Sequence, residues 1–514
     1  MNTGSISADL QWDPYQRPDL PQFDERRLSR VGVIDVGSNS VRLVVFDGAA
    51  RSPAYFYNEK LMCGLGSSLS TSGILNPEGR VRAINAIQRF KHLAMAMGIP
   101  EMTAVATAAV REAKDGVDFC REVYETTGQK IWIIDGREEA RISAQGILLG
   151  WPGSYGLVCD LGGSSMELAE INNGEVGRRA TSRLGPLKLM EIDGGRAARA
   201  KFVRETIEKL ALEMGPQHNR LFLVGGSWRA LARIDMIRTD YPLMVLHEYR
   251  MDALSVRKTL NFIKKNTNSK LQYVSSLSDA RFSLVPFAGE VLEVILDVFE
   301  PKDIAVSSYG LREGILYEQM SDDIRARDPL IEACKVSEKN DARVPGMGKS
   351  LNKFVAPLFP NASMELLRLI KAACMLHDVS WRAHPDYRAE VCFDNATRAN
   401  LGGLKHSERI FLGLALMHRY KTKRDDEAFA PLIALLDQDE IKNAGILGKA
   451  MRLGAMMWIS DNAQHAKIKW DPQSSKLTLR LKKSSQALFG EVASARLDSL
   501  AASLGCKANH MIDE

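Results

Sequence analysis

The sequence lacks the features that mark membrane, secreted and zinc-binding proteins. Its 514 residues include seven cysteines, none spaced as Cys-x-x-Cys or clustered with histidines as in a zinc site. No stretch is long and apolar enough to span a bilayer, and residues 1–30 contain no apolar core of a signal peptide. Low-complexity runs are also missing. We therefore expect a cytoplasmic protein with reduced, buried thiols and no membrane contact.

The composition is that of an ordinary globular protein with several domains. Hydrophobic residues make up 45% of the chain and charged residues 25%. A chain of this length exceeds one compact domain, so we expect three or four domains. The formal net charge of +5 is compatible with an anionic partner but does not identify one.

Strand-like and helical segments alternate through the first 316 residues, which indicates an α/β fold. Trp151, Pro152 and Gly153 interrupt this pattern and mark a domain boundary. From about residue 317 helical periodicity prevails, and residues 477–481 form the one strand expected there. The expected parts are an N-terminal arm (1–30), two α/β domains (31–150 and 151–316), a helical domain (317–465) and a small α/β unit (466–514).

An internal duplication is the most informative feature of the sequence. Residues 33–43 align without gaps on residues 158–168. The matched pairs are Asp35 with Asp160, Gly37 with Gly162, and Ser40 with Ser165. Glycines and small polar residues allow backbone N–H groups to form a concave anion site. Two copies in register predict two related lobes that hold phosphate between their turns, whereas the alternative is two ordinary β-hairpins.

Two carboxylates near the second turn suggest a metal ion. Asp160 and Glu167 flank a loop expected to bind phosphate, and a carboxylate repels a phosphate unless a cation lies between them. Mg²⁺ suits this role because it binds few carboxylates together with waters and phosphate oxygens. The alternative for Glu167 is a solvent-facing position on its strand.

Strand-to-helix junctions carry the candidate catalytic side chains. Arg111 is suited to grip phosphate oxygens, although most helical arginines are surface residues. Glu138 and Glu139 open the next helix, where the macrodipole favours carboxylates whatever their function. Adjacent helix residues point about 100° apart, so only one of the two can face a cleft and activate water there. A further turn at residues 224–229 could bind an anion at a helix N-terminus.

Five motifs together resemble the exopolyphosphatase / guanosine pentaphosphate phosphatase (Ppx/GppA) family of the actin-like superfamily. The motifs are Asp35-Val-Gly-Ser-Asn-Ser40, Ala106-Thr-Ala-Ala-Val-Arg111, Gly136-Arg-Glu-Glu-Ala-Arg141, Asp160-Leu-Gly-Gly-Ser-Ser-Met-Glu167 and Tyr309-Gly-Leu-Arg-Glu-Gly314. The likeness covers residues 31–320 firmly and the remainder loosely. It implies two actin-like (ribonuclease H-like) α/β domains, a helical HD-like domain and a small terminal α/β unit.

The resemblance also implies a role for each site residue by its position. Glu139 matches the family's catalytic base and Arg111 its phosphate-binding arginine. Asp160 and Glu167 match its metal-linked carboxylates. The implied phosphate-binding residues are Asp35, Gly37, Ser38, Asn39, Ser40, Gly162, Gly163, Ser164, Ser165, Gly226 and Ser227.

The sequence departs from the family pattern in two loops. Ser164 replaces the third glycine of the second loop, and Trp228 and Arg229 replace a glycine and a threonine of the third. We expect a tryptophan at position 228 to narrow any nucleoside pocket, which favours a plain phosphate chain as substrate.

The C-terminal extension is similar to that of the longer exopolyphosphatases. Its His377 and Asp378 resemble an HD metal site, but no histidine lies between His247 and His377 to complete one. The basic residues of the extension form either a solvated face or a track for a polyanion. They include Lys405, Arg409, Arg419, Lys421, Lys423 and Arg424.

These features predict an exopolyphosphatase that hydrolyses the terminal phosphate of inorganic polyphosphate and releases orthophosphate. The expected cofactor is Mg²⁺, with another divalent or a monovalent cation as alternatives. We expect polyphosphate as the partner, no nucleic acid, and a homodimer. The alternatives are hydrolysis of guanosine pentaphosphate, a kinase of the same superfamily, or a polyphosphate sensor without catalysis.

Overall fold

The computed structural model describes most of the chain as two compact units. The described residues are 12–18, 30–48, 50–99, 101–217, 219–266, 277–421, 426–457 and 465–513. The first unit spans residues 1–326 and the second residues 327–514. Of the expected N-terminal arm only residues 12–18 and Arg30 are described, and the remainder of that prediction lies outside the described residues.

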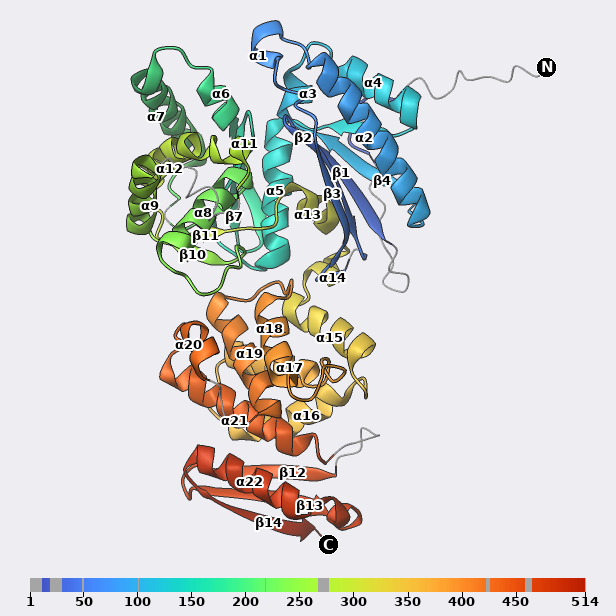
Figure 1. The fold of residues 1–514 in the computed structure, drawn as a ribbon, viewed down its shortest axis with the longest axis vertical. Coiled ribbons are helices and arrows are strands. Elements are labelled where there is room, and N and C mark those ends of the chain that lie inside the picture. Colours follow the sequence, from blue (N-terminus) through green and yellow to red (C-terminus); the bar gives the residue numbers. More distant parts are fainter. Residues whose placement is uncertain are drawn as a thin grey trace, which may run out of the picture. The chain divides into compact units, whose positions relative to one another are not determined.

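The first unit contains two mixed sheets of related topology (Figure 1). Their strand orders are β3-β2-β1-β4-β5 and β10-β11-β9-β6-β7-β8. In the first sheet, β1 pairs antiparallel with β2 and parallel with β4. In the second sheet, β6 pairs antiparallel with β7 and parallel with β9. The strands are β1 (Val31–Val36), β2 (Ser40–Phe46), β3 (Tyr55–Met62), β4 (Met102–Ala106), β5 (Ile131–Ile133), β6 (Gly156–Leu161), β7 (Met166–Asn172), β8 (Glu175–Ser182), β9 (Arg220–Val224), β10 (Tyr249–Met251) and β11 (Asp303–Val306). The two duplicated segments therefore occupy equivalent hairpins, one in each sheet.

The helices of the first unit follow the local signals in the sequence. Asn76 caps α2 by accepting a hydrogen bond from the Gly79 N–H, with Pro77 at the first helical position. The helices are α1 (Leu69–Ser72), α2 (Pro77–Ala96), α3 (Ala108–Glu112), α4 (Gly116–Thr127), α5 (Gly136–Gly150), α6 (Pro186–Met190), α7 (Gly195–Met214), α8 (Gly226–Arg238), α9 (Ala253–Lys265), α11 (Asp279–Phe282), α12 (Val285–Phe299), α13 (Leu311–Glu318) and α14 (Asp322–Arg325).

Helix α5 lies between the two sheets and belongs to the core of both (Figure 1). Its Ile142 packs with side chains of the first sheet, and its Ile147 packs with those of the second. Helix α13 packs directly against α5, and at their crossing there is no room for a side chain at Gly314. A Cβ on Gly314 would lie 1.8 Å from the Ile142 carbonyl oxygen. The crossing fixes the first turn of α5 relative to both sheets.

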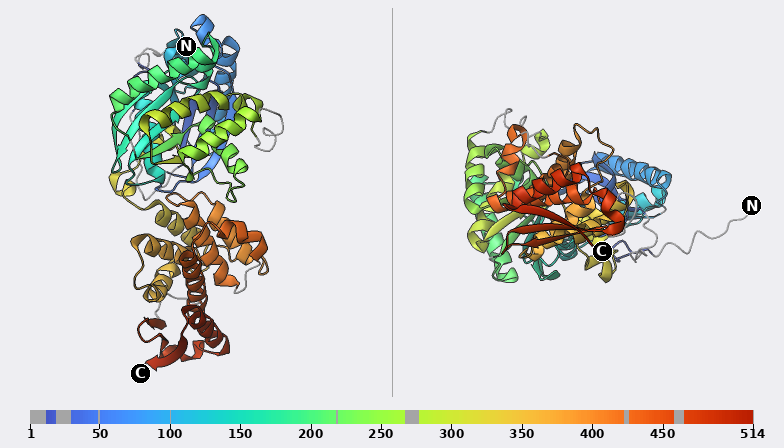
Figure 2. Two further views of the ribbon diagram at one scale, coloured as in Figure 1. Left: turned by 90° about the vertical axis from the view of Figure 1, so that its left-hand side faces the viewer. Right: turned by 90° about the horizontal axis from the view of Figure 1, so that it is seen from below.

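The second unit is largely helical and ends in a small sheet. Its helices are α15 (Pro329–Asp341), α16 (Met347–Val355), η1 (Ala356–Leu358), α17 (Met364–Leu376), α18 (Arg388–Arg398), α19 (His406–Tyr420), α20 (Asp426–Ile433), α21 (Gln438–Gly454), η2 (Lys483–Leu488) and α22 (Glu491–Leu504). The sheet comprises β12 (Ala466–Asp471), β13 (Lys476–Lys482) and β14 (Lys507–Asp513), and α22 lies against one of its faces (Figures 1 and 2). The sequence had indicated only the middle strand.

The predicted α/β fold with a largely helical C-terminal region is confirmed. All seven cysteines are free thiols and six of them are buried. Among the described residues, the helices are all too short or too polar to pass through a lipid bilayer.

Candidate active site

The duplicated turns have the same internal geometry, and they touch. In the first turn the Gly37 N–H donates to the Ser40 carbonyl at 3.0 Å, and in the second the Gly162 N–H donates to the Ser165 carbonyl at 3.0 Å. The Ser38 and Ser164 hydroxyl oxygens are 3.1 Å apart. The two loops, 126 residues apart in sequence, therefore converge on one point.

Backbone amides at the tips of both turns are available to an anion. The Ser38 carbonyl accepts from the Gly66 N–H at 2.8 Å, and the Gly163 carbonyl accepts from the Leu187 N–H at 2.9 Å. Because C=O and N–H point in opposite directions across a trans peptide, the next amides, of Asn39 and Ser164, point the other way. Neither amide has a hydrogen-bond partner in the described part of the chain. Such unpaired N–H groups form an anion-binding concavity.

A cavity of about 300 Å³ lies between the turns and contains most of the predicted site. All eleven predicted phosphate-binding residues line it, from Asp35 in the first turn to Ser227 at the start of α8, and so do Glu139 and Asp160. Arg111 and Glu167 do not line the cavity; they lie behind residues that do. The amides of Gly37 and Gly162 are used within their own turns, so these two glycines shape the loops without contributing N–H donors.

Of the two glutamates that open α5, Glu139 lines the cavity. Its Oε2 lies 3.0 Å from Arg111 Nη1, which also donates to the Ile134 carbonyl at 2.8 Å. Burial raises the pKa of Glu139 to about 7, against the opposing effect of Arg111 and with a contribution from nearby Asp160. Glu138 instead accepts two hydrogen bonds from Arg141, at 2.7 and 2.6 Å. A carboxylate that titrates near neutral pH is suited to take a proton from water.

Four carboxylates crowd the inner part of the site, and burial raises the pKa of each. They are Asp35, Glu139, Asp160 and Glu167. The Ser143 hydroxyl donates to Asp160, and the Thr181 hydroxyl donates to Glu167 at 3.1 Å. No three described His, Cys, Asp or Glu side chains form a preformed metal site. This donor set fits an ion such as Mg²⁺, which needs one or two carboxylates and takes its other ligands from water and phosphate.

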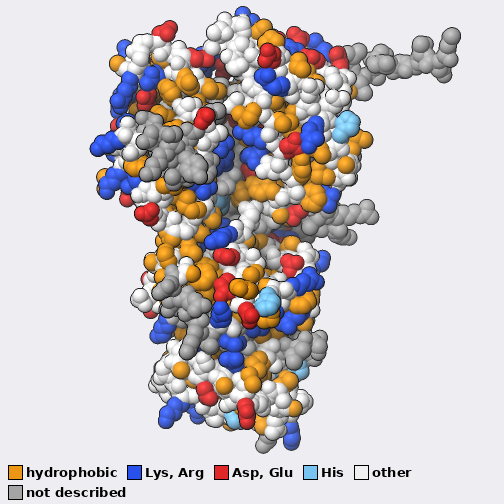
Figure 3. Space-filling model, viewed as in Figure 1, with side chains coloured by type: hydrophobic (Ala, Val, Ile, Leu, Met, Phe, Trp, Pro, Cys, Tyr) orange, Lys and Arg blue, Asp and Glu red, His pale blue; other side chains and the backbone are white. Residues whose placement is uncertain are grey.

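The cavity also contains five cationic side chains that were not predicted as site residues. They are Arg42 on β2, Lys60 on β3, Arg229 on α8, Arg281 on α11 and Arg312 on α13. Burial and repulsion by Arg312 lower the pKa of Arg42 to about 10. Burial and repulsion by Arg281 also lower the pKa of Lys60. Basic side chains are visible around the hollow between the two lobes of the first unit (Figure 3). Cations that repel one another in a cleft are stabilised by a polyanion.

Three of these cations lie in segments that the sequence had marked, although none was predicted as a site residue. Arg312 belongs to one of the family motifs, and its Nε lies 3.9 Å from Asp35 Oδ2. Arg42 lies in the duplicated segment 33–43, and Arg229 lies in the turn at residues 224–229. Only the tertiary structure adds Lys60 and Arg281 to the site.

The expectation that Trp228 narrows a nucleoside pocket is wrong. Its side chain is fully buried in the core of the second lobe, while its neighbour Arg229 lines the cavity. The reason is the rotation of about 100° between successive helix residues, which turns one side chain inward and the next outward. Trp228 therefore gives no argument against a nucleotide substrate.

In the second unit an arginine pairs with the aspartate of the His-Asp pair. Arg343 donates to both carboxylate oxygens of Asp378, at 2.8 and 2.5 Å. His377 is buried, its Nδ1 lies 2.7 Å from the Cys374 carbonyl oxygen, and burial lowers its pKa to about 4. Both side chains are therefore held by contacts with described residues.

The proposed basic track of the extension is partly wrong. Arg409 is buried and donates to the Ala399 and Leu401 carbonyls at 2.7 and 2.6 Å, so it cannot meet a polyanion. Lys421 pairs with Glu390 at 2.5 Å. Lys423 and Arg424 lie outside the described residues.

The chain matches two known protein families. Residues 44–323 match the Ppx/GppA phosphatase family, and residues 340–511 match the family described as "Exopolyphosphatase, C-terminal". Retrograde regulation protein 2 of Saccharomyces cerevisiae is 23% identical over 479 residues, which cover 83% of this chain and 80% of that protein. Exopolyphosphatase 1 of Mycobacterium tuberculosis is 25% identical over 323 residues, which cover 60% of this chain and 92% of that protein.

A solved structure shares the fold of about half of the chain. An exopolyphosphatase from Cytophaga hutchinsonii superposes with a TM-score of 0.50 at 22% identity, covering 56% of this chain and 97% of that one. The predicted actin-like arrangement of the two lobes is confirmed by this likeness of fold.

Proposed function

This chain belongs to the Ppx/GppA phosphatase family and is a phosphoanhydride hydrolase, and we propose that it removes the terminal phosphate of inorganic polyphosphate as orthophosphate. One observation carries the choice of substrate. The twin turns meet at Ser38 and Ser164, and their free amides share a cavity with five cationic side chains. Polyphosphate bears one negative charge on every phosphate, so a single chain can contact the free amides and the cationic side chains at the same time, whereas a single orthophosphate cannot.

In the proposed mechanism the terminal phosphoryl group binds the amides of Asn39 and Ser164, and the rest of the chain follows the cations. Glu139 accepts a proton from the attacking water, which forms the new P–O bond as the bond to the remaining chain breaks. The amides stabilise the charge that develops on the phosphoryl oxygens. Asp160 is the residue that would hold a divalent cation, which would supply additional charge neutralisation for the leaving phosphate.

The pairing of Arg111 with Glu139 gives the arginine two roles. At 3.0 Å from Glu139 Oε2, its guanidinium stabilises the ionised carboxylate that a general base requires. Its second role is positional: Nη1 also donates to the Ile134 carbonyl at 2.8 Å, so the arginine links Glu139 on α5 to the residue that follows β5.

The proposal also covers the metal ion, the cellular compartment and the oligomeric state. Phosphatases of this family depend on a metal, and we propose Mg²⁺ at Asp160 and Glu167. We also propose a cytoplasmic homodimer, as the family resemblance implies, which sizing of the purified chain by light scattering would test.

Guanosine pentaphosphate is a second candidate substrate. The position of Trp228 in the core removes the expected obstacle to a nucleoside, and a relative from Pseudoalteromonas translucida, 24% identical, is named guanosine-5'-triphosphate,3'-diphosphate pyrophosphatase. The cation cluster would then bind the two phosphate groups of one nucleotide.

The test is phosphate release from the purified full chain. Long polyphosphate and guanosine pentaphosphate are compared at equal phosphate concentration, with Mg²⁺ and with a chelator, and the length of the remaining polyphosphate is followed by electrophoresis. We expect orthophosphate from the first turnover onward and a dependence on Mg²⁺.

Different results would reject the proposal. Intermediate-length fragments without early orthophosphate would indicate internal cleavage. Faster release from the nucleotide would favour the second candidate, and tight binding of polyphosphate with no release would favour a sensor.

A further inference from the structure

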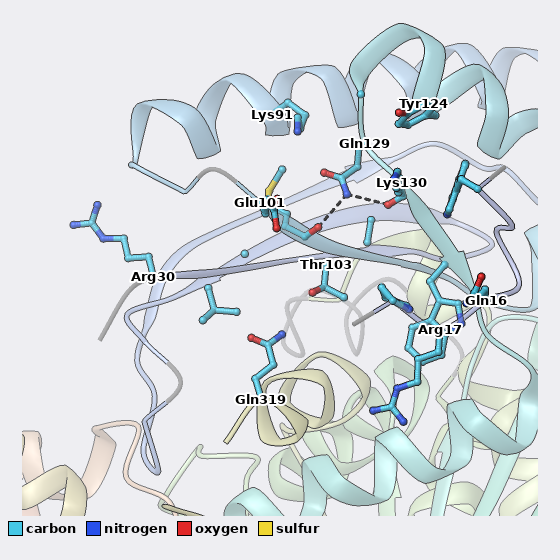
Figure 4. A pocket seen from close by; sticks show the side chains of 18 residues that line it. Gln16, Arg17, Arg30, Lys91, Glu101, Thr103, Tyr124, Gln129, Lys130 and Gln319 are labelled. Atoms are coloured by element: carbon cyan, nitrogen blue, oxygen red, sulfur yellow. Dashed lines mark hydrogen bonds between the residues drawn. The ribbon is translucent and has the colours of Figure 1, made fainter. Parts of the chain in front are cut away.

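A second cavity of the first unit lies at the opposite end of the first sheet from the twin turns. It measures about 570 Å³ and is bounded by the starts of β1, β4 and β5, the end of α13 and residues 12–18 (Figure 4). The first turn follows the other end of β1, so no residue lines both cavities. The inference from this cavity does not depend on the function proposed above.

The wall formed by residues 12–18 is attached to the lobe at three points. The Ile133 N–H donates to the Pro14 carbonyl at 2.9 Å, which extends the edge of the sheet. The ring of Trp12 packs on Tyr124 with 5.5 Å between the centroids. Arg17 pairs with Glu318 at 3.0 Å. This segment is therefore a built part of the cavity.

A buried acceptor in this cavity has no donor. Gln319, which follows α13, is 1% exposed, and its Oε1 lacks a hydrogen-bond partner among the described residues. In Figure 4 its carboxamide rises toward Thr103. A buried carbonyl without a donor is unfavourable, because it has given up its hydrogen bonds to water. The last torsion of a glutamine side chain is soft, so this oxygen can turn to meet a donor in the cavity.

The lining of the cavity carries four basic side chains, those of Arg17, Arg30, Lys91 and Lys130, and one carboxylate, that of Glu101. Lys91 and Lys130 line it, and neither forms an ion pair with a described residue. The ends of α2 and α4 lie nearby, and the negative end of a helix dipole favours lysine without any ligand. The helix dipole therefore explains why lysines occur at this place, but it does not explain why Gln319 Oε1 lacks a hydrogen-bond donor.

Aromatic rings complete the lining. Trp12, Tyr124 and Trp132 all contribute to the wall, and Lys130 Nζ lies 5.8 Å from the centre of the Tyr124 ring. Aromatic walls bind flat rings by stacking, and amide acceptors select rings that carry N–H groups. The size is that of a small-molecule pocket.

We propose that this cavity binds a planar nitrogen base that carries an anionic group, as a nucleoside monophosphate does. An N–H on the edge of the base donates to Gln319 Oε1. The base lies against the aromatic wall, and the anionic group faces the lysines.

Isothermal titration of the full chain tests the proposal with four probes: GMP, AMP, ribose 5-phosphate and guanosine. We expect one-to-one binding of GMP or AMP. Ribose 5-phosphate has no nitrogen base and guanosine has no anionic group, so each should bind about tenfold more weakly or worse.

Variants identify the cavity. Gln319→Leu keeps the volume and removes the acceptor, so it should leave the melting temperature unchanged or raised and weaken nucleotide binding by about tenfold. The control Lys209→Ala removes an exposed lysine on α7 and should change nothing. If Gln319→Leu does not fold, Lys130→Ala takes its place with the same expected loss.

The overturning results are equally specific. Absence of saturable binding by both nucleotides refutes the site. Binding that survives Gln319→Leu but is lost in Arg229→Ala also refutes it, because the ligand would then lie in the cleft of the twin turns.

Discussion

Glu139→Gln tests the catalytic base and its electrostatic cost in one experiment. The pKa of Glu139 rises from an ordinary 4.5 to about 7, mainly through burial. Between pH 4.5 and about pH 7 the Glu139 carboxyl is protonated in the folded protein but ionised in the unfolded chain. The free energy of unfolding therefore falls as the pH rises through this range. The cost to the folded state is on the order of 1 kcal/mol at pH 5.5 and on the order of 3 kcal/mol at pH 8.5.

Glutamine has no charge, so the variant avoids this cost. Its free energy of unfolding relative to the wild type should therefore increase by about 2 kcal/mol between pH 5.5 and pH 8.5. The charge-dependent part of the contact with Arg111 is already contained in the pKa of about 7, so it needs no separate correction in this difference. At the same time phosphate release should fall by about 10²- to 10⁴-fold, because the proton acceptor is gone.

The assay is urea unfolding at the two pH values without divalent ions, together with phosphate release from polyphosphate. Glu138→Gln is the matched control, since Glu138 is bound by Arg141 and does not line the cavity. That control should release phosphate at close to the wild-type rate. A pH-independent stability difference in Glu139→Gln would refute the burial argument, and near-normal phosphate release would refute the role as base.

Three further substitutions test other parts of the structure. Gly314→Ala places a methyl group 1.8 Å from the Ile142 carbonyl oxygen and should cost about 1–3 kcal/mol or more in urea unfolding. Arg229→Ala removes one of the cavity cations and should raise KM for polyphosphate about three- to tenfold and weaken its salt dependence, with kcat nearly unchanged. Arg343→Ala leaves the Asp378 carboxylate unpaired and should lower the melting temperature of the second unit, which Asp378→Asn in the same chain should partly restore.

Each of these predictions has its own contradicting result. Gly490 has no atom within 4 Å of a built Cβ, so Gly490→Ala is the control for Gly314→Ala, and equal costs would contradict the crowding argument. A fall in kcat with no change in KM would contradict the assignment of Arg229 to substrate binding. If Asp378→Asn lowers the melting temperature of the Arg343→Ala variant further, this result would contradict the pairing of Arg343 with Asp378.

The sequence by itself determined the local elements of the site. The shared spacing of Asp, Gly and Ser in two segments predicted twin turns, because turn geometry depends on a few consecutive residues. The hairpins formed with the same register and the same internal hydrogen bonds. Only one of the adjacent residues Glu138 and Glu139 faces the cleft, as predicted, because the rotation between successive helix residues is a property of the backbone.

Only the tertiary structure decided which side chains meet. It turned Trp228 into the core and brought five cations together from five elements, and it placed Glu139, which the family resemblance had already implied as the base, at the cavity. It also buried Arg409, which the sequence had placed on a surface. These outcomes depend on how two sheets pack around α5, and the contacts involved join residues far apart in the chain. A local pattern cannot encode them, because the same turns and helices could pack at other angles and bring different side chains into the cleft.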